Sequence, residues 1–502
     1  MLLSALIWLP IAGAIGLSLW PIGDSKVMQR LTLGVTVAVL ILTGVVLWQF
    51  DPSVGTPQMV ERWDWLPQLS LSYDLGIDGI SLPLVVMTAA LLVVAVVASP
   101  RRLERPRFYY SLVLLIEAGV LGVFLAQNLL LFFLFYEVEL LPLYFLIAIW
   151  GGARRTYAAT KFLLYTALSG ILLLGAFFVW GWLGGSFLYD ALGQAQLTTG
   201  SQVLLLIPLL LGLAIKIPLV PLHTWLPDAH VEASTPVSVL LAGVLLKLGT
   251  YGLVRFGVQM LPEGWQVVAP WLGALAVLNV LYGSFNALAQ DDLKKMVAYS
   301  SIAHMGSVLL AAAAATPLSV LAAVAQMVSH GLITALLFLL VGAIYTNTGT
   351  RDIKLLTGLM NPERGLPLIG SLMVLGVMAS AGIPGMIGFV AEFMVYRSSF
   401  SVLPIPTLLC IIGTGLTSFY FVRLVNRVFF GRLSERAAAM PRRQTFERLP
   451  AAVLALVIII LGIQPGWLLH WSEATVSQLP TPVVAKALAP EPLALGIPEF
   501  QG

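Results

Sequence analysis

Eight ionisable side chains lie in apolar stretches long enough to cross a membrane, and these residues could do chemistry. They are Glu117, Glu137, Glu139, Lys216, Lys247, His304, His330 and Glu392. A charged side chain inside a membrane span costs about 2.5–3.5 kcal/mol on insertion scales, so such residues are functional by default. Burial weakens the hold of an ammonium on its proton, and a nearby carboxylate restores it. Buried lysines and carboxylates together are therefore typical of a protein that moves protons or cations.

Glu137 and Lys216 are the residues that we expect to form a switchable ion pair, because each is costly to bury alone. Two unit charges 4 Å apart attract by about 4 kcal/mol at an effective dielectric constant of 20. Making or breaking one such pair therefore changes the proton affinity of a buried lysine strongly. Glu139 is expected on roughly the opposite side of the helix, where a structural or intersubunit contact is as reasonable as transport. Lys247 lies near mid-span, which favours a function over a side chain that reaches the membrane surface.

Two histidines in later spans, His304 and His330, suit a proton relay because imidazole titrates near neutral pH. The alternative for both is a core histidine with satisfied hydrogen bonds. For Glu117, a structural and a functional interpretation are equally acceptable.

The chain offers no motif for a cofactor or a metal. His223 and His230 stand near Asp228 and Glu232, but their spacing matches no metal signature. The single cysteine, Cys410, excludes a disulfide framework and an iron–sulfur cluster held by this chain alone. A P-loop, a dinucleotide-binding fingerprint and a haem-ligand pattern are also missing from the sequence. We therefore expect no cofactor and no metal on this chain, so that partner subunits must energise any transport.

Composition places the chain in a membrane. Of its 502 residues, 59% are hydrophobic and 10% are charged, and the mean hydropathy is +0.94. Soluble domains carry about 25% charged residues. The basic residues are dispersed rather than gathered in one patch, so the sequence gives no sign of nucleic-acid binding.

Apolar runs of about 20 residues, the length that spans a bilayer, predict an all-α membrane protein with about fourteen transmembrane helices. The expected spans are 2–20, 30–50, 80–98, 108–126, 128–150, 161–184, 203–230, 234–256, 267–289, 296–315, 317–346, 366–400, 403–430 and 449–470.

The loops between these spans differ in charge. With the N-terminus outside, 21 of the 27 Lys and Arg residues lie in inward loops or at their edges, and Lys216 and Lys247 lie inside spans. Such a bias follows the positive-inside rule and predicts that both termini lie outside. The outward side holds only Arg62, Arg255, Arg397 and Lys486.

Two spans carry helix breakers. Residues 214–230 contain three prolines, and residues 379–393 contain Pro384 among several glycines. Proline removes a helical hydrogen bond, and freed backbone groups persist at membrane depth only inside protein or beside a wet cavity. Paired broken helices indicate inverted repeats and a transport site, although each break alone could be a packing kink. We expect two inverted five-helix repeats, at 108–256 and 267–430, with an N-terminal part at 1–107 and a C-terminal part at 431–502.

These motifs resemble a known family, the antiporter-like subunits of complex I and related membrane complexes. The resemblance runs from about Asp78 to Arg427 and rests on FFLFYEVELLPLYFLIAIWGG, AIKIPLVPLHTWLPDAH, LLKLGTYGLVRF, DLKKMVAYSSIAHMG and MVSHGLITALLF. In that family the matching residues form a central hydrophilic axis that carries protons. The resemblance gives this role to Glu137, Lys216, Lys247, His304, His330 and Glu392.

Glutamate at position 392 and the stretch YAATKFLLYTA (157–167) are similar to the subunit 4 type (M, or NdhD) of cyanobacterial and plastid NDH-1. This resemblance implies a thylakoid location, an NDH-1 complex whose iron–sulfur clusters and plastoquinone are bound elsewhere, and a neighbouring L-type (NdhF) subunit. The resemblance also fits the variant of this subunit that belongs to an NDH-1 complex for CO2 uptake. The alternatives are a subunit of an Mrp-type cation/proton antiporter, which shares most motifs, and a structural membrane scaffold.

Overall fold

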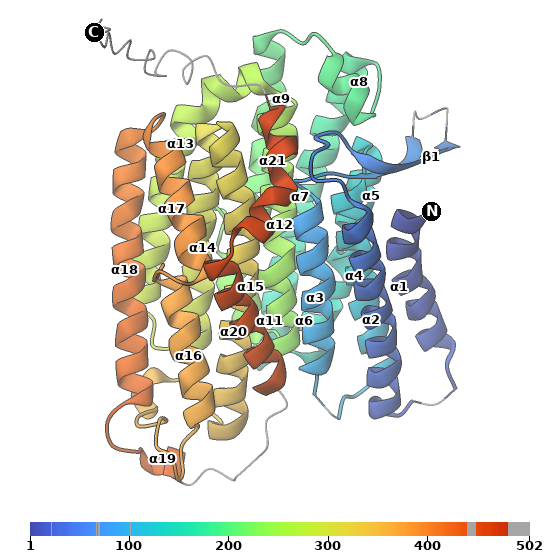
Figure 1. Ribbon diagram of the computed structural model, residues 1–502. Helices are drawn as coiled ribbons and strands as arrows, with labels where there is room; N and C mark the ends of the chain where they lie inside the picture. Colours follow the sequence, from blue (N-terminus) through green and yellow to red (C-terminus); the bar gives the residue numbers. More distant parts are fainter. Residues whose placement is uncertain (22, 67, 69–70, 101, 439–447, 480–502) are drawn as a thin grey trace, which may run out of the picture.

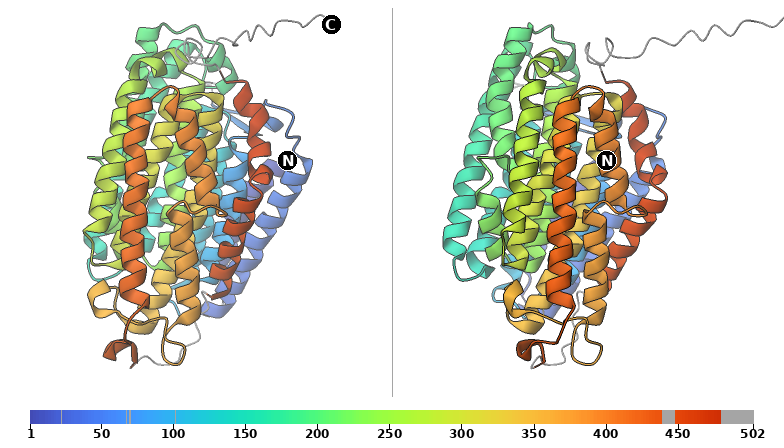
Figure 2. Two further views of the ribbon diagram at one scale, coloured as in Figure 1. Left: turned by 60° about the vertical axis from the view of Figure 1, so that its left-hand side comes forward. Right: turned by 90° about the vertical axis from the view of Figure 1, so that its left-hand side faces the viewer.

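The helices form one bundle in which most axes run in roughly the same direction (Figures 1 and 2). The computed structural model describes residues 1–21, 23–66, 68, 71–100, 102–438 and 448–479. Four of the basic residues counted above lie outside these ranges: Arg101, Arg442, Arg443 and Lys486. The end of the predicted C-terminal part also lies outside them.

The described residues of the N-terminal part form three helices and a β-hairpin. The hairpin occupies much of the acidic segment that joins the second and third spans, where the sequence predicted only a loop. Its cross-strand pairs explain it, because Arg62 lies opposite Asp74, and the Trp63 and Tyr73 rings stack with centroids 5.4 Å apart. The elements are α1 (Leu2–Leu19), α2 (Ser25–Gln49), β1 (Gln58–Leu66), β2 (Leu71–Ile77) and α3 (Leu82–Val97).

The range predicted for the first repeat is helical but often interrupted. Two of its segments are π-helical, and they flank the short helix that carries Lys247. The elements are α4 (Pro106–Leu125), α5 (Leu129–Val138), α6 (Leu140–Trp150), α7 (Arg155–Gly184), α8 (Tyr189–Gln194), α9 (Thr199–Lys216), α10 (Trp225–Glu232), α11 (Thr235–Leu240), η2 (Leu241–Leu245), α12 (Leu246–Gly252) and η3 (Leu253–Gln259).

The second half contains two of the most buried helices. Helices α14 and α15 are almost entirely buried, as is the segment Thr235–Gln259 of the first half, which carries Lys247. The elements are α13 (Pro262–Leu288), α14 (Leu293–Ala314), α15 (Pro317–Thr348), η4 (Ile353–Leu355), α16 (Pro367–Ser380), α17 (Ile387–Phe400), α18 (Pro404–Phe429), α19 (Glu435–Ala438), α20 (Arg448–Ile463) and α21 (Gly466–Ser477).

By length and composition, 11 helices among the described residues could cross a membrane, or up to 12 if the bent pair α20–α21 is one span. The fourteen predicted spans would also need the shorter helix α3 and the broken pair α16–α17. The protein is therefore a polytopic helical membrane protein, and the count of fourteen stays a prediction.

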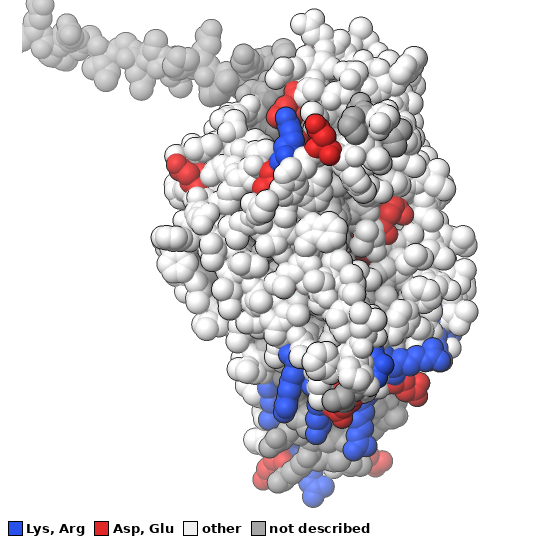
Figure 3. Space-filling model, turned by 90° about the vertical axis from the view of Figure 1, so that its right-hand side faces the viewer, with Lys and Arg blue, Asp and Glu red and all other residues white. Residues whose placement is uncertain are grey.

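Charge is distributed unevenly along the bundle. On the face drawn in Figure 3, most Lys and Arg side chains gather at the lower end. The β-hairpin and the N-terminus lie towards the other end (Figure 1). This polarity agrees with the loop bias on which the predicted orientation depends.

Candidate functional site

The first predicted break is confirmed, and it places Lys216 at the end of a helix. Helix α9 ends at Lys216, and α10 begins only at Trp225. Protein groups satisfy the interrupted backbone, because Asn279 Oδ1 accepts the Val220 N–H at 2.7 Å and the Trp225 indole donates to the Ile215 carbonyl at 2.8 Å. Lys216 is thus held at a packed break, where only 1% of its surface is exposed.

Lys216 pairs with Glu139 and not with Glu137, so the predicted partner is wrong. The reason is a second interruption, because Pro142 has no N–H to bond the carbonyl four residues earlier. Helix α5 therefore ends at Val138, and Glu139 lies between α5 and α6 rather than on a regular helical face. The helical-wheel argument that pointed Glu139 away from Lys216 does not apply there.

Lys247 lies near the middle of the bundle and is completely buried. Its ammonium donates to the Ala242 carbonyl at 2.5 Å and lies 2.8 Å from Nδ1 of His330. The π-helical segments on both sides of α12 widen the helix locally, a feature frequent at functional sites. An exposed lysine at the membrane surface, the alternative interpretation, is excluded by this burial.

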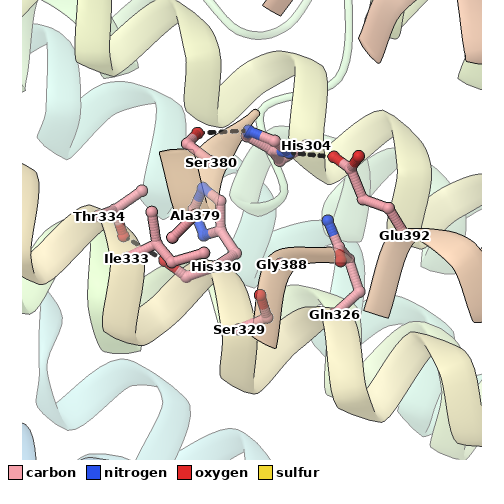
Figure 4. A pocket seen from close by; sticks show the side chains of 10 residues that line it. All are labelled: His304, Gln326, Ser329, His330, Ile333, Thr334, Ala379, Ser380, Gly388 and Glu392. Atoms are coloured by element: carbon pink, nitrogen blue, oxygen red, sulfur yellow. Dashed lines mark hydrogen bonds and ion pairs between the residues drawn. The ribbon is translucent and has the colours of Figure 1, made fainter. Parts of the chain in front are cut away.

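The second predicted break is confirmed as well, and it places Glu392 opposite His304. Helix α16 ends at Ser380, and α17 begins at Ile387. His304 Nδ1 lies 3.3 Å from Glu392 Oε1, and its Nε2 lies 3.1 Å from the Ser380 hydroxyl (Figure 4). One histidine therefore bridges the end of α16 and the carboxylate of α17.

A small cavity joins His330 to His304 and Glu392 (Figure 4). The two imidazole rings lie 5.7 Å apart between centroids. The free space is about 10 Å³, close to the minimum that one water molecule needs. Gln326, Ser329 and Ser380 add polar groups to its wall. The cavity is therefore polar enough, and just large enough, to link the two histidines through a single water.

Four of the six predicted residues thus form a buried line that begins at Lys247 in the first repeat and runs through His330 and His304 to Glu392 in the second. The other two, Glu137 and Lys216, belong to a separate cluster in the first half. Helix α12 packs close to that cluster, because a Cβ on Gly249 would lie 3.2 Å from Cβ of Lys216.

The remaining candidates are Glu117, His223 and His230, of which His230 lies within electrostatic reach of Lys247 and His330. Glu117 is fully buried, and neither of its oxygens has a hydrogen-bond partner among the described residues. His223 packs edge-on against Tyr282, and His230 stacks on Phe338 with centroids 4.6 Å apart.

Asp228 and Glu232, the neighbours of these two histidines, face basic residues rather than a metal site. Asp228 pairs with Lys161 at 2.8 Å. Glu232 Oε2 accepts the backbone N–H of Arg154 at 2.8 Å. Within the part of the chain that the structure describes, no three His, Cys, Asp or Glu side chains are grouped so that they could hold a metal ion.

Sequence reasoning missed a buried ion pair at the hairpin end of the bundle. Arg255 was counted on the outward side at the end of a predicted span, but it lies in η3 with 3% of its side chain exposed and pairs with Asp78 at 2.6 Å. Tyr251 and Gln259 also hydrogen-bond its guanidinium, at 3.1 and 2.7 Å. Asp78 directly precedes the third span, so a carboxylate and an arginine at the edges of two spans were the available signal.

Comparison with known proteins agrees with this architecture. The profile of the family described as "NADH:quinone oxidoreductase/Mrp antiporter, TM" matches residues 126–417. NAD(P)H-quinone oxidoreductase chain 4 3 of Trichormus variabilis is 42% identical over 478 residues, which cover 92% of this chain and 88% of that protein. This chain belongs to that family.

The fold recurs in solved membrane complexes. A chain of respiratory complex I from Thermus thermophilus matches 97% of this chain and 100% of its own length, with 27% identity and a TM-score of 0.85. A chain of the Mrp complex from Dietzia sp. matches 97% of this chain and 98% of its own length, with a TM-score of 0.84. The sequence identity to this second chain is 22%, so the similarity concerns the fold alone.

Proposed function

We propose that this chain is a proton-translocating subunit in the membrane arm of an NDH-1 complex, the complex I type of NAD(P)H- or ferredoxin-quinone oxidoreductase. The observation that carries the proposal is the buried line of four ionisable side chains from Lys247 to Glu392. Four ionisable side chains in contact or one water apart are expensive to keep in a membrane. The oxidoreductase part of the proposal comes from the enzyme names of the chain's relatives, and this chain would be one subunit of such an enzyme.

The geometry of the line supports stepwise proton movement. A proton transfer needs heavy atoms within about 2.6–3.2 Å, or one intervening water. The contact between Lys247 and His330 lies inside this limit. The other ring nitrogen of His330, Nε2, has no partner among the described groups, and His330 lines the small cavity. His330 can therefore accept a proton at Nδ1 and release the one on Nε2, which can cross through water to His304. The last transfer joins His304 Nδ1 to Glu392 Oε1, which lie 3.3 Å apart, just beyond this limit, so these two groups must approach slightly.

The first half has a matching arrangement. In each predicted repeat the second and fourth spans meet through an acid and a base, Glu139 with Lys216 in the first repeat and His304 with Glu392 in the second. In the first repeat the acid lies on the second span and the base on the fourth, and in the second repeat the base lies on the second span and the acid on the fourth. We infer that the repeats at 108–256 and 267–430 each build one acid–base contact, and that Lys247 and His330 join them.

Glu392 lies between this line and a groove on the other side of α17. It lines the small cavity on one side and, on the other, a groove of about 740 Å³ between α17 and α18. The groove is mostly apolar, with Phe389, Phe393 and Phe400 in its wall and Arg397 at its side. We propose that the neighbouring L-type (NdhF) subunit packs here, so that Glu392 ends the path within this chain at the boundary between two subunits.

The redox chemistry would belong to other subunits. Iron–sulfur clusters and plastoquinone are proposed to bind there, with none on this chain. The proposed location is the thylakoid membrane, with both termini on the lumenal side. The subunits that copurify with the chain would identify its complex, because ferredoxin-docking partners indicate the electron-transfer form and carbonic-anhydrase-like partners indicate the CO2-uptake form.

The alternative is an Mrp-type antiporter subunit, since the matched family covers both kinds of protein. Sodium distinguishes them. In vesicles, proton movement that requires quinone reduction and is independent of sodium supports the NDH-1 assignment, and proton movement that requires sodium supports the antiporter. A scaffold would show neither.

Lys247→Met tests the function directly. It removes the ammonium that contacts His330, so proton pumping driven by quinone reduction should be lost while the complex still assembles. Lys295→Met is the matched control, because Lys295 lies in the first turn of α14 at the basic end of the bundle and away from the line. Normal pumping in Lys247→Met would refute the proposal.

A further inference from the structure

Two carboxylates and one ammonium share the core of the first repeat. Glu137 and Glu139 stand two residues apart on the fifth span, and Lys216 is the lysine that faces them. Only Glu139 forms an ion pair with it. The cluster therefore contains one carboxylate more than its single lysine neutralises.

The contact between Glu139 and Lys216 is enclosed on every side. Glu139 is 0% exposed and Lys216 1% exposed. The ammonium also lies 4.3 Å from the centre of the Tyr136 ring, a cation–π contact. The hydroxyl of that ring lies 2.9 Å from the Ser169 hydroxyl, which in turn donates to the Gly212 carbonyl at 2.7 Å. These contacts hold the ring, and the ring keeps the ammonium beside Glu139.

Glu137 has different surroundings. It is only partly buried, and its carboxylate lies against α7 at Gly170. A Cβ added to Gly170 would come within 2.1 Å of Glu137 Oε1, so only glycine leaves room for the carboxylate there. Glu137 is also within electrostatic reach of both Lys216 and Glu139.

We propose that Glu139 is the fixed counter-ion that positions Lys216, and that Glu137 is the carboxylate of this span that takes up and releases a proton. The inference rests on the proposed function, because it gives the cluster a role in moving protons. With all three groups ionised the cluster carries one net negative charge, and one added proton makes it neutral. A low-dielectric interior favours the neutral state.

The added proton belongs on Glu137 because one oxygen of Glu139 already pairs with the Lys216 ammonium, whereas Glu137 forms no ion pair with it. Uptake forms an O–H bond on Glu137 and neutralises its carboxylate. Release breaks that bond and restores the charge, while the ion pair beside it persists. The chain thus separates two tasks, holding the lysine and carrying the proton, between two neighbouring glutamates.

Matched glutamine substitutions on the same span test this division. Glu139→Gln should lower the abundance of the assembled complex several-fold, because it leaves the Lys216 ammonium buried without a counter-charge. Glu139→Gln combined with Lys216→Met should recover that abundance. Glu137→Gln should leave abundance unchanged and lower proton pumping driven by quinone reduction. Gly170→Ala, which displaces the Glu137 carboxylate, should reproduce that pumping defect.

Three outcomes would overturn the inference: an abundance in Glu139→Gln equal to that of the unmodified chain, no recovery in the double variant, or normal pumping in Glu137→Gln. Failure of the proposed function looks different. In that case Lys247→Met also pumps normally, whereas failure of this inference alone leaves the Lys247→Met defect in place.

Discussion

Gly388 sets the distance between the two halves of the second broken helix, and alanine at this position should disconnect Glu392 from His304. A Cβ added to Gly388 would lie 1.8 Å from the Ala379 carbonyl oxygen and 3.3 Å from Cδ1 of Ile333. The oxygen belongs to the backbone of α16, so it cannot rotate away as a side chain would. The helices themselves must therefore separate.

The required shift follows from contact distances. A carbon and a carbonyl oxygen approach to about 3.3 Å at the closest, so α17 must move by about 1.5 Å at this point. Glu392 lies one turn after Gly388 on the same face of α17 and moves with it. Its present distance to His304 is 3.3 Å, and a comparable shift takes the two groups beyond hydrogen-bond reach.

The assay measures proton pumping by membrane vesicles during quinone reduction, together with the abundance of the assembled complex. Overpacking of this kind costs about 1–3 kcal/mol of stability, and a misplacement of about 1 Å can lower a rate about 10²-fold. Gly388→Ala should therefore lose more pumping than abundance. Gly175→Ala is the control, because no atom lies within 4 Å of the added Cβ. Pumping equal to that of the Gly175→Ala control would refute the reasoning.

Further predictions concern the relay, the buried ion pair and the orientation of the chain. His330→Gln keeps a group that can hydrogen-bond Lys247, but glutamine cannot take up and release a proton. Assembly should therefore persist, and pumping should fall about 10²-fold or more. Pumping near normal would remove His330 from the path. Arg255→Met leaves the Asp78 carboxylate buried without a counter-charge and should destabilise the fold by about 3–5 kcal/mol, measured as a lower unfolding temperature. Adding Asp78→Asn should recover part of this loss of stability. No recovery would mean that the two residues are not coupled. Tags at either terminus should react with an impermeant label only from the lumenal face, and labelling from the opposite face would contradict the predicted orientation.

The sequence predicted the positions of the broken helices well, because their cause is local. Prolines and glycines act on their own turns of helix, and the structure ends α9 at Lys216 and α16 at Ser380 as this reasoning requires. The burial of Lys247 and Glu392 also followed from hydrophobic context alone. In each case the deciding information lay within a few residues of the feature.

The features that sequence reasoning missed depend on backbone irregularity or on distant partners. The ion pair of Lys216 was assigned to Glu137 because a regular helix was assumed through Pro142. The pair between Asp78 and Arg255 joins residues 177 positions apart, which one sequence without partner information cannot connect. The β-hairpin lies in a short segment between spans, where hydropathy carries little signal.

The central claim is that the buried line ending at Glu392 moves protons, and Glu392→Gln tests it most directly. This substitution keeps the size of the side chain and removes its ability to take up and release a proton. In vesicles that hold a normal amount of assembled complex, we expect quinone reduction to drive little or no acidification in the Glu392→Gln variant, and Glu392→Lys to retain more. Acidification by Glu392→Gln at the rate of the unmodified complex would contradict the claim.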